Sequence, residues 1–178
     1  MTFNATQLNQ LSNQFQQLSN LPYYITSPII EKFLAMDARF ATAVFLVQLE
    51  VAERLVAKPG TRDYGYLTVA TQLVCAVELV CKVPPEAFDP PPKVTSAVLA
   101  IRTKKTIPDV AISDRIFWLA RLGFASRRKQ LHSLLASPIK KTNAEVKELL
   151  VGLGLPATAR AQELSIAQWT ALAHLISI

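Results

Sequence analysis

The sequence predicts an α/β domain followed by a small all-helical unit, and three patterns in its 178 residues support this. In the first hundred residues, short apolar segments alternate with segments of helical periodicity. After about residue 103, only helical patterns with capping residues and Gly or Pro stops follow. Within the first part, the loop 84–93 holds five prolines in ten residues and separates two predicted strands.

The predicted α/β part spans residues 1–104. The apolar run at 44–47 indicates a strand that is buried on both faces. Pro28 suits the first turn of a helix, and Pro59-Gly60 suits the end of one. In chain order we expect a strand at 15–19, a helix at 28–34, a strand at 41–49, helices at 50–57 and 66–75, and strands at 77–83 and 94–102.

The predicted helical part spans residues 105–178, with 103–112 as the linker. Small polar residues that cap helices and glycines that end them divide it into four helices. The expected helices are 113–122 with Gly123 as its stop, a helix capped by Ser126 that runs to 135, one capped by Asn143 that ends at Gly152, and one capped by Ser165 that runs to 176.

Composition favours a globular cytoplasmic protein. The chain is 51% hydrophobic, which is enough for a core. No apolar run reaches the roughly 18 residues that span a bilayer, and the N-terminus lacks a secretory pattern. Cys75 and Cys81 fit no metal-ligand spacing and are expected to be buried free thiols, so we expect no metal.

Positive charge is concentrated in the second part. Residues 102–178 carry 12 Lys or Arg against 5 Asp or Glu, whereas residues 1–101 carry 7 against 8. This asymmetry is typical of a protein in which one part contacts a polyanion. A basic surface that serves only solubility is the alternative.

The segment Asn20-Leu21-Pro22-Tyr23 suits chemistry on a flat base that carries an amine. The Asn20 side-chain oxygen and a backbone carbonyl can accept the two amine hydrogens, and Pro22 holds the backbone rigid. Tyr23 can stack on the base. The alternative is a simple turn, since Asn-x-Pro is a common turn sequence.

Phe88 lies in the proline-rich loop, in the run Phe88-Asp89-Pro90-Pro91-Pro92-Lys93. Stacked prolines hold an aromatic ring in place at low entropic cost. Together with Tyr23, Phe88 could clamp an extruded base on both of its faces.

Five segments in this order make the chain resemble the ribosomal RNA adenine dimethyltransferase family. The resemblance covers nearly the whole chain, and its specificity comes from the joint occurrence of the segments. They are 20–25 (NLPYYI), 48–55 (QLEVAERL), 88–96 (FDPPPKVTS), 123–131 (GFASRRKQL) and 160–165 (RAQELS).

The resemblance implies the later half of a Rossmann-like methyltransferase sheet, followed by a helical RNA-binding domain. The implied activity is transfer of two methyl groups from S-adenosylmethionine to each of two adjacent adenines near the 3′ end of small-subunit ribosomal RNA. Asn20 would contact both the donor and the adenine, and the Leu21 and Pro22 carbonyls would line the position of the amine. Tyr23 and Phe88 would hold the base. No metal is needed.

The basic run Arg127, Arg128 and Lys129 is expected to contact RNA phosphates, with a plain solvated face as the alternative. The implied partner is small-subunit ribosomal RNA or a pre-ribosomal particle, which a monomer would engage.

One part of the family pattern is missing. The five glycines are Gly60, Gly65, Gly123, Gly152 and Gly154, and none lies in a Gly-rich loop after an early strand. The chain begins about where the family's third strand has ended. We therefore expect weak or absent donor binding by residues 1–178 alone. A non-catalytic RNA-binding or ribosome-assembly protein of the same fold is the rival hypothesis, and a DNA adenine methyltransferase is a weaker one.

Overall fold

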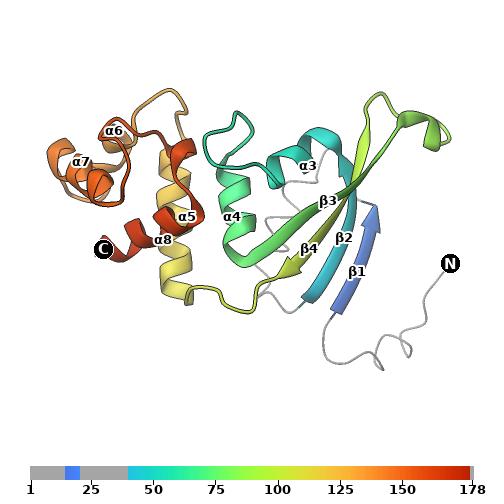
Figure 1. The fold of residues 1–178 in the computed structure, drawn as a ribbon, viewed down its shortest axis with the longest axis horizontal. Coiled ribbons are helices and arrows are strands. Elements are labelled where there is room, and N and C mark those ends of the chain that lie inside the picture. The colour runs from blue at the N-terminus through green and yellow to red at the C-terminus, as the bar shows by residue number, and fades with distance from the viewer. Residues whose placement is uncertain (1–14, 21–39, 177–178) are drawn as a thin grey trace. The chain divides into compact units, whose positions relative to one another are not determined.

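The computed structural model describes residues 15–20 and 40–176 (Figure 1). The chain consists of two compact units. Unit 1 comprises residues 1–56 and 74–105, and unit 2 comprises residues 57–73 and 106–178. Each unit is described by itself below.

A four-stranded sheet forms the centre of unit 1, in the order β1-β2-β4-β3. The strands are β1 (Phe15–Asn20), β2 (Phe40–Gln48), β3 (Cys75–Val83) and β4 (Ser96–Thr103). Strand β1 pairs with β2 in parallel, and β4 is antiparallel to both β2 and β3. The four predicted strands are therefore present, with ends that shift by one or two residues.

Strand β2 is fully buried on one face only, so the prediction of two buried faces was wrong. Ala43, Phe45 and Val47 are inaccessible to solvent, whereas Val44 and Leu46 are partly exposed. Successive side chains of a strand point to opposite faces, and this alternation separates the two sets. The strand buried on both faces is instead β4, where the consecutive residues 99–101 are all buried.

Two helices follow the predicted positions closely. Helix α3 (Leu49–Leu55) packs on the sheet with Ala52 and Leu55 buried, and helix α4 is Tyr66–Val74. A short 3-10 helix, η2 (Pro85–Ala87), starts the proline-rich loop. The predicted helix 28–34 lies outside the described residues.

The division between the units differs from the predicted boundary between 104 and 105. The change from unit 1 to unit 2 after Lys105 lies one residue from the predicted boundary. Residues 57–73, which include most of α4, however also cluster with the helical unit. The sequence does not indicate this membership, because residues 57–73 stand between two elements of unit 1, α3 and β3. Their hydrogen-bond partners lie about 60 residues further along the chain.

Unit 2 is helical, as predicted. Its helices after residue 105 are α5 (Val110–Phe124), α6 (Leu131–Leu135), α7 (Asn143–Gly152) and α8 (Ile166–Leu175), with a 3-10 helix η3 (Ala161–Glu163) before α8. The core is formed by large side chains from these helices and from the segment before α4, namely Tyr64, Ile116, Leu119, Leu131, Leu135, Leu150 and Trp169.

Gly123 does not end its helix, which corrects the prediction. Helix α5 continues to Phe124, and it begins three residues earlier than expected because the Asp109 side chain accepts from the Ile112 N–H at 2.8 Å. A Cβ at Gly123 would lie 2.9 Å from Leu131 Cδ1 and 3.0 Å from Trp169 Cη2. Glycine is therefore needed here for close helix packing.

The next two helix starts also differ from the prediction. Ser126 caps no helix: residues 127–129 form a turn, and α6 begins only at Leu131 after Gln130. The cap of α7 is Thr142, one residue before the predicted Asn143. Ser165 caps α8 as predicted, by accepting from the Gln168 N–H at 3.2 Å.

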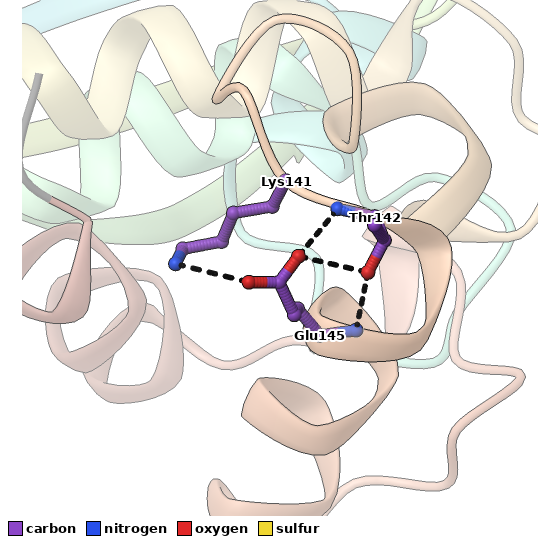
Figure 2. Close-up of polar contacts among 3 residues, drawn as sticks. All are labelled: Lys141, Thr142 and Glu145. Carbon is purple, nitrogen blue, oxygen red and sulfur yellow. Dashed lines mark hydrogen bonds and ion pairs between the residues drawn. The ribbon is translucent and has the colours of Figure 1, made fainter.

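Helix α7 begins with a reciprocal capping box (Figure 2). The Thr142 hydroxyl accepts from the Glu145 N–H at 3.2 Å, and the Glu145 carboxylate accepts from the Thr142 N–H at 2.7 Å. The Thr142 hydroxyl also donates to this carboxylate at 2.8 Å. These hydrogen bonds from Thr142, backbone first, lower the pKa of Glu145, and Lys141 adds a smaller effect of the same sign.

Within the described part of the chain, no helix combines the length and the apolar character that crossing a membrane requires.

We predict that Gly123→Ala lowers the free energy of unfolding of the protein by about 1–2 kcal/mol. Overpacking against Leu131 and Trp169 outweighs the gain in helix propensity. Urea unfolding followed by tryptophan fluorescence measures the change. Gly152→Ala is the control, because a Cβ there meets no atom within 4 Å. Equal effects of the two substitutions would contradict the packing argument.

We also predict a pH-dependent contribution from the capping box. Because the pKa of Glu145 is lowered in the folded state, its stabilisation is complete above the unfolded carboxyl pKa of about 4.3 and is lost as pH falls through the lower folded value. Urea unfolding at pH 6, 5, 4 and 3 should show a smaller decrease in stability for Glu145→Gln than for the wild type. Identical pH profiles would refute this assignment.

Candidate functional site

The carboxyl ends of the two parallel strands define one edge of the sheet. Strand β1 ends at Asn20, whose Cα partner is Leu46 of β2, and β2 itself ends at Gln48. Ligands of α/β sheets bind outside the carboxyl ends of parallel strands. Asn20 therefore lies at the edge of the sheet where such a site forms.

The proline-rich loop lies at this same edge. Strand β3 ends at Val83, which pairs with Ser96 at the start of β4, so the connection 84–95 begins and ends there. Ser96 also pairs with Gln48 of β2, and the Leu49 N–H donates to the Thr95 carbonyl at 3.0 Å. The loop is thus fixed by backbone pairing to the end of β2 (Figure 1).

Phe88 is partly exposed at the end of η2, where its N–H donates to the Pro85 carbonyl at 3.1 Å. The following Asp89–Pro90 peptide bond is cis. The topology therefore brings the Asn20 backbone and the Phe88 loop to one edge of unit 1. Leu21, Pro22 and Tyr23 lie outside the described residues, and the base-binding roles stay predictions.

Arg127 has a structural contact that the sequence did not predict. Its Nη1 donates to the Tyr64 carbonyl at 2.8 Å, and its Nη2 donates to the Arg62 carbonyl at 2.6 Å. Its guanidinium also lies 5.9 Å from the centre of the Phe124 ring. Arg128 and Lys129 are exposed. The predicted RNA-contacting cluster thus contains one residue that is bound to the loop before α4.

Sequence reasoning missed this loop, because Pro59-Gly60 was interpreted only as the end of a helix. The turn holds two exposed cations, Lys58 and Arg62, and the Gly60 N–H donates to the Gln162 carbonyl at 2.7 Å. The only available indication was the pair of cations that flank a Pro-Gly turn.

The two thiols differ in exposure. Cys75 is buried as predicted, and burial raises its pKa to about 11 despite the nearby Lys104, so it is a poor nucleophile at neutral pH. Cys81 is exposed, which corrects the prediction. It lies at the register shift of β3, after Leu79, where the strand irregularity interrupts the alternation of its faces.

His132 has a structural role. Its Nε2 lies 2.8 Å from the Gln130 side-chain oxygen and its Nδ1 lies 3.2 Å from that of Asn143, so the ring links α6 to α7. Across the described ranges, no three His, Cys, Asp or Glu side chains gather in the manner of a metal site.

A family profile described as "Ribosomal RNA adenine dimethylase" matches residues 1–177. The chain belongs to this family. The resemblance inferred from the five segments is thereby confirmed.

Curated relatives agree. The chain is 42% identical to "Ribosomal RNA small subunit methyltransferase A" of Rippkaea orientalis, over 97% of this chain and 65% of that protein. It is 40% identical to the protein of the same name from Thermosynechococcus vestitus, over 89% and 61%. The chain therefore spans less than two thirds of the length of these relatives.

Solved structures of similar fold support the predicted fold class. A dimethyladenosine transferase from Plasmodium falciparum superposes with a TM-score of 0.72 at 27% identity, over 89% of this chain and 66% of that one. The 23S rRNA methyltransferase ErmE gives 0.70 at 28% identity, over 93% and 66%. The α/β methyltransferase fold with a following helical unit is confirmed.

The family implies S-adenosylmethionine as co-substrate, and the described residues fit only part of such a site. The sheet edge at Asn20 is suitable, but a glycine cradle for the donor is not found there. Gly60 and Gly65 flank the loop before α4, Gly123 is packed inside α5, and the other two glycines stand at the end of α7.

Proposed function

We propose that this chain supplies the base-binding edge and the RNA-binding unit of a ribosomal RNA adenine dimethyltransferase. The proposed reaction transfers two methyl groups from S-adenosylmethionine to each of two adjacent adenines near the 3′ end of small-subunit ribosomal RNA. The enzyme acts as a monomer on this RNA or on a pre-ribosomal particle, during ribosome biogenesis.

The observation that carries the proposal is the identity of 40–42% to proteins named small-subunit methyltransferase A, over 89–97% of the chain. ErmE, whose name states 23S rRNA, has a similar fold but only 28% identity. The higher identity favours the small subunit over the large one as the source of the substrate.

The chemistry assigned to the edge follows from the substrate. The lone pair of an adenine amine is delocalised into the ring, so the nitrogen is a weak nucleophile. The Asn20 amide oxygen and a backbone carbonyl accept the two amine hydrogens, which favours a geometry with the lone pair directed at the donor methyl. The Leu21 and Pro22 carbonyls line the position of the amine. The methyl donor would supply an electrophilic carbon on a sulfonium and leave as a neutral thioether, and the adenine amine would release one proton for each methyl that it gains.

Two rings hold the base outside its helix. Tyr23 stacks on one face and Phe88 on the other, and such stacking contributes about 1–3 kcal/mol per base. The partial exposure of Phe88 leaves part of its ring free for contact. The backbone pairing of Thr95 with Leu49 fixes the loop that carries Phe88, so little entropy is lost when the ring engages the base.

A second candidate is a non-catalytic RNA-binding or ribosome-assembly protein of the same fold. The placement of the five glycines favours it, because none stands at a strand end of the described sheet. Both candidates bind small-subunit RNA, and they differ only in donor-dependent methylation of adenine.

A chimera tests the proposed catalysis. The segment of the Rippkaea orientalis relative that precedes the matched region is fused ahead of residue 1, and methyl incorporation into unmethylated small-subunit RNA is measured. We expect dimethyladenine formation, its loss in Asn20→Ala, and a fall of about 10–100-fold in kcat/KM in Phe88→Ala because one stacking face is removed.

The chimera carries its own controls. Phe88→Tyr keeps a ring and should retain most activity, and Val151→Ala changes an exposed side chain on α7 and should have no effect. If the chimera binds donor and RNA but forms no methylated adenine, the non-catalytic candidate is correct.

We predict separately that residues 1–178 alone bind S-adenosylmethionine weakly or not at all, because no glycine cradle stands at the described sheet edge. Isothermal titration calorimetry measures this directly. Donor affinity in the micromolar range for the 178-residue polypeptide would show that the prediction is wrong.

A further inference from the structure

The last residues of the loop 84–95 have no part in the proposed base clamp, although one of them is an exposed apolar side chain. Val94 is 42% exposed. Within the described residues of unit 1, the only other large apolar side chain with comparable exposure is that of Val80. A single exposed apolar residue needs no explanation by itself. Val94 differs from Val80 because it stands at the sheet edge that ends at Asn20 and Gln48.

The backbone beside Val94 is fixed on both of its neighbouring strands. The next carbonyl along the chain, that of Thr95, accepts from the Leu49 N–H at 3.0 Å. The following residue, Ser96, is fully buried and pairs with Gln48 of β2 and Val83 of β3. A β-branched side chain has few rotamers. Val94 therefore presents its methyl groups from a nearly fixed position, and little entropy is lost when they make a contact.

Charge divides the loop into two halves. Glu86 and Asp89 lie in the first half, and Lys93 lies in the second, directly before Val94. All three side chains are exposed, and none forms an ion pair with another described residue. Carboxylates repel RNA phosphates, whereas an ammonium group attracts them. An RNA strand at this edge is therefore expected to pass along the second half of the loop, on the side of Val94.

The sheet order places this half of the loop to one side of the target base. Strand β1, which ends at Asn20, pairs with one side of β2, and β4 pairs with the other side. Two strand spacings, about 10 Å, therefore separate β1 from β4. A residue that enters β4 is thus placed beside a base held at the end of β1, where the next nucleotide of the same strand would lie.

We propose that Lys93 and Val94 form a subsite for the nucleotide that flanks the target adenine. Val94 packs on the base of this nucleotide, and Lys93 binds its phosphate. The inference rests on the proposed function for its ligand, and it deepens that function by adding a second nucleotide to the contact surface of the edge. When one adenine of the adjacent pair is the target, the other one occupies the subsite.

An apolar contact of this kind does not read the identity of the base. It uses the flat face that all four bases share, so the subsite requires a base but tolerates a change of base. An abasic nucleotide is therefore the probe that removes the contact, and it leaves the phosphate for Lys93 in place.

The test is a double-mutant cycle between Val94 and the flanking base. Affinity of the 178-residue chain is measured, without methyl donor, for a transcript of the 3′ end of small-subunit RNA and for two transcripts in which one adenine of the pair, in turn, is abasic. Val94→Ser should lower affinity for the intact transcript by about three- to tenfold. The same substitution should have little effect on at least one abasic transcript, because the partner of the side chain is missing there.

Two variants serve as matched controls. Val94→Ile keeps an apolar β-branched side chain and should retain the affinity of the wild type. Val80→Ser changes the same residue type at 54% exposure in the same sheet, away from the edge, and should leave all affinities unchanged. An equal loss from Val94→Ser with all three transcripts would overturn the subsite. Equal binding of the intact and abasic transcripts by the wild type would overturn it as well.

The phosphate contact has its own readout. Lys93→Ala should lower the slope of log K against log salt by about 0.7, which is the value for one phosphate of a single strand. Arg102→Ala is the control, because this residue lies near the opposite end of β4 and pairs with Glu78 at 2.9 Å. An unchanged slope in Lys93→Ala would refute the proposed path of the RNA strand along the second half of the loop.

The outcomes distinguish the subsite from the proposed function. Coupling between Val94 and the flanking base, together with a chimera that forms no methylated adenine, would support the subsite and refute the catalysis. An active chimera with no such coupling would support the catalysis and refute the subsite.

Discussion

The antiparallel position of β4 between β2 and β3 is the constraint on which the candidate site depends. Because β4 runs against β2, its first residue, Ser96, lies beside the last residue of β2, Gln48. The loop that precedes β4 must therefore stand at the edge where β1 and β2 end. No side-chain chemistry is required for this placement, since backbone pairing alone brings the Phe88 loop to the edge that Asn20 occupies.

The helical unit depends on a different kind of constraint, which is close approach. Gly123 lets α5 pack against Leu131, Ala161 and Trp169 at distances that a Cβ would not allow. The same packing carries Phe124 and Arg127, which connect the loop before α4 to this core. The absence of a side chain at Gly123 thus permits the close packing of the segment in which Arg127 binds the loop before α4.

Local chemistry explains which elements could be predicted from the sequence. Strands and helices with strong periodicity appear within a few residues of their expected ends, and Ser165 caps its helix as its side chain suggests. Two of the errors arise where distant parts of the chain meet. Gly123 resembles a helix stop but meets Trp169, and Ser126 resembles a cap but precedes a turn held by Arg127. No local window contains these partners.

The sequence by itself determined the family, the alternation of strands and helices, and the candidate residues Asn20 and Phe88, because each of these depends on residue type and short-range spacing. Only the tertiary structure decided that residues 57–73 cluster with the helical unit and that Arg127 binds the loop before α4. The physical reason is that backbone hydrogen bonds and buried rings connect segments tens of residues apart, and these connections have no periodicity that a sequence can display.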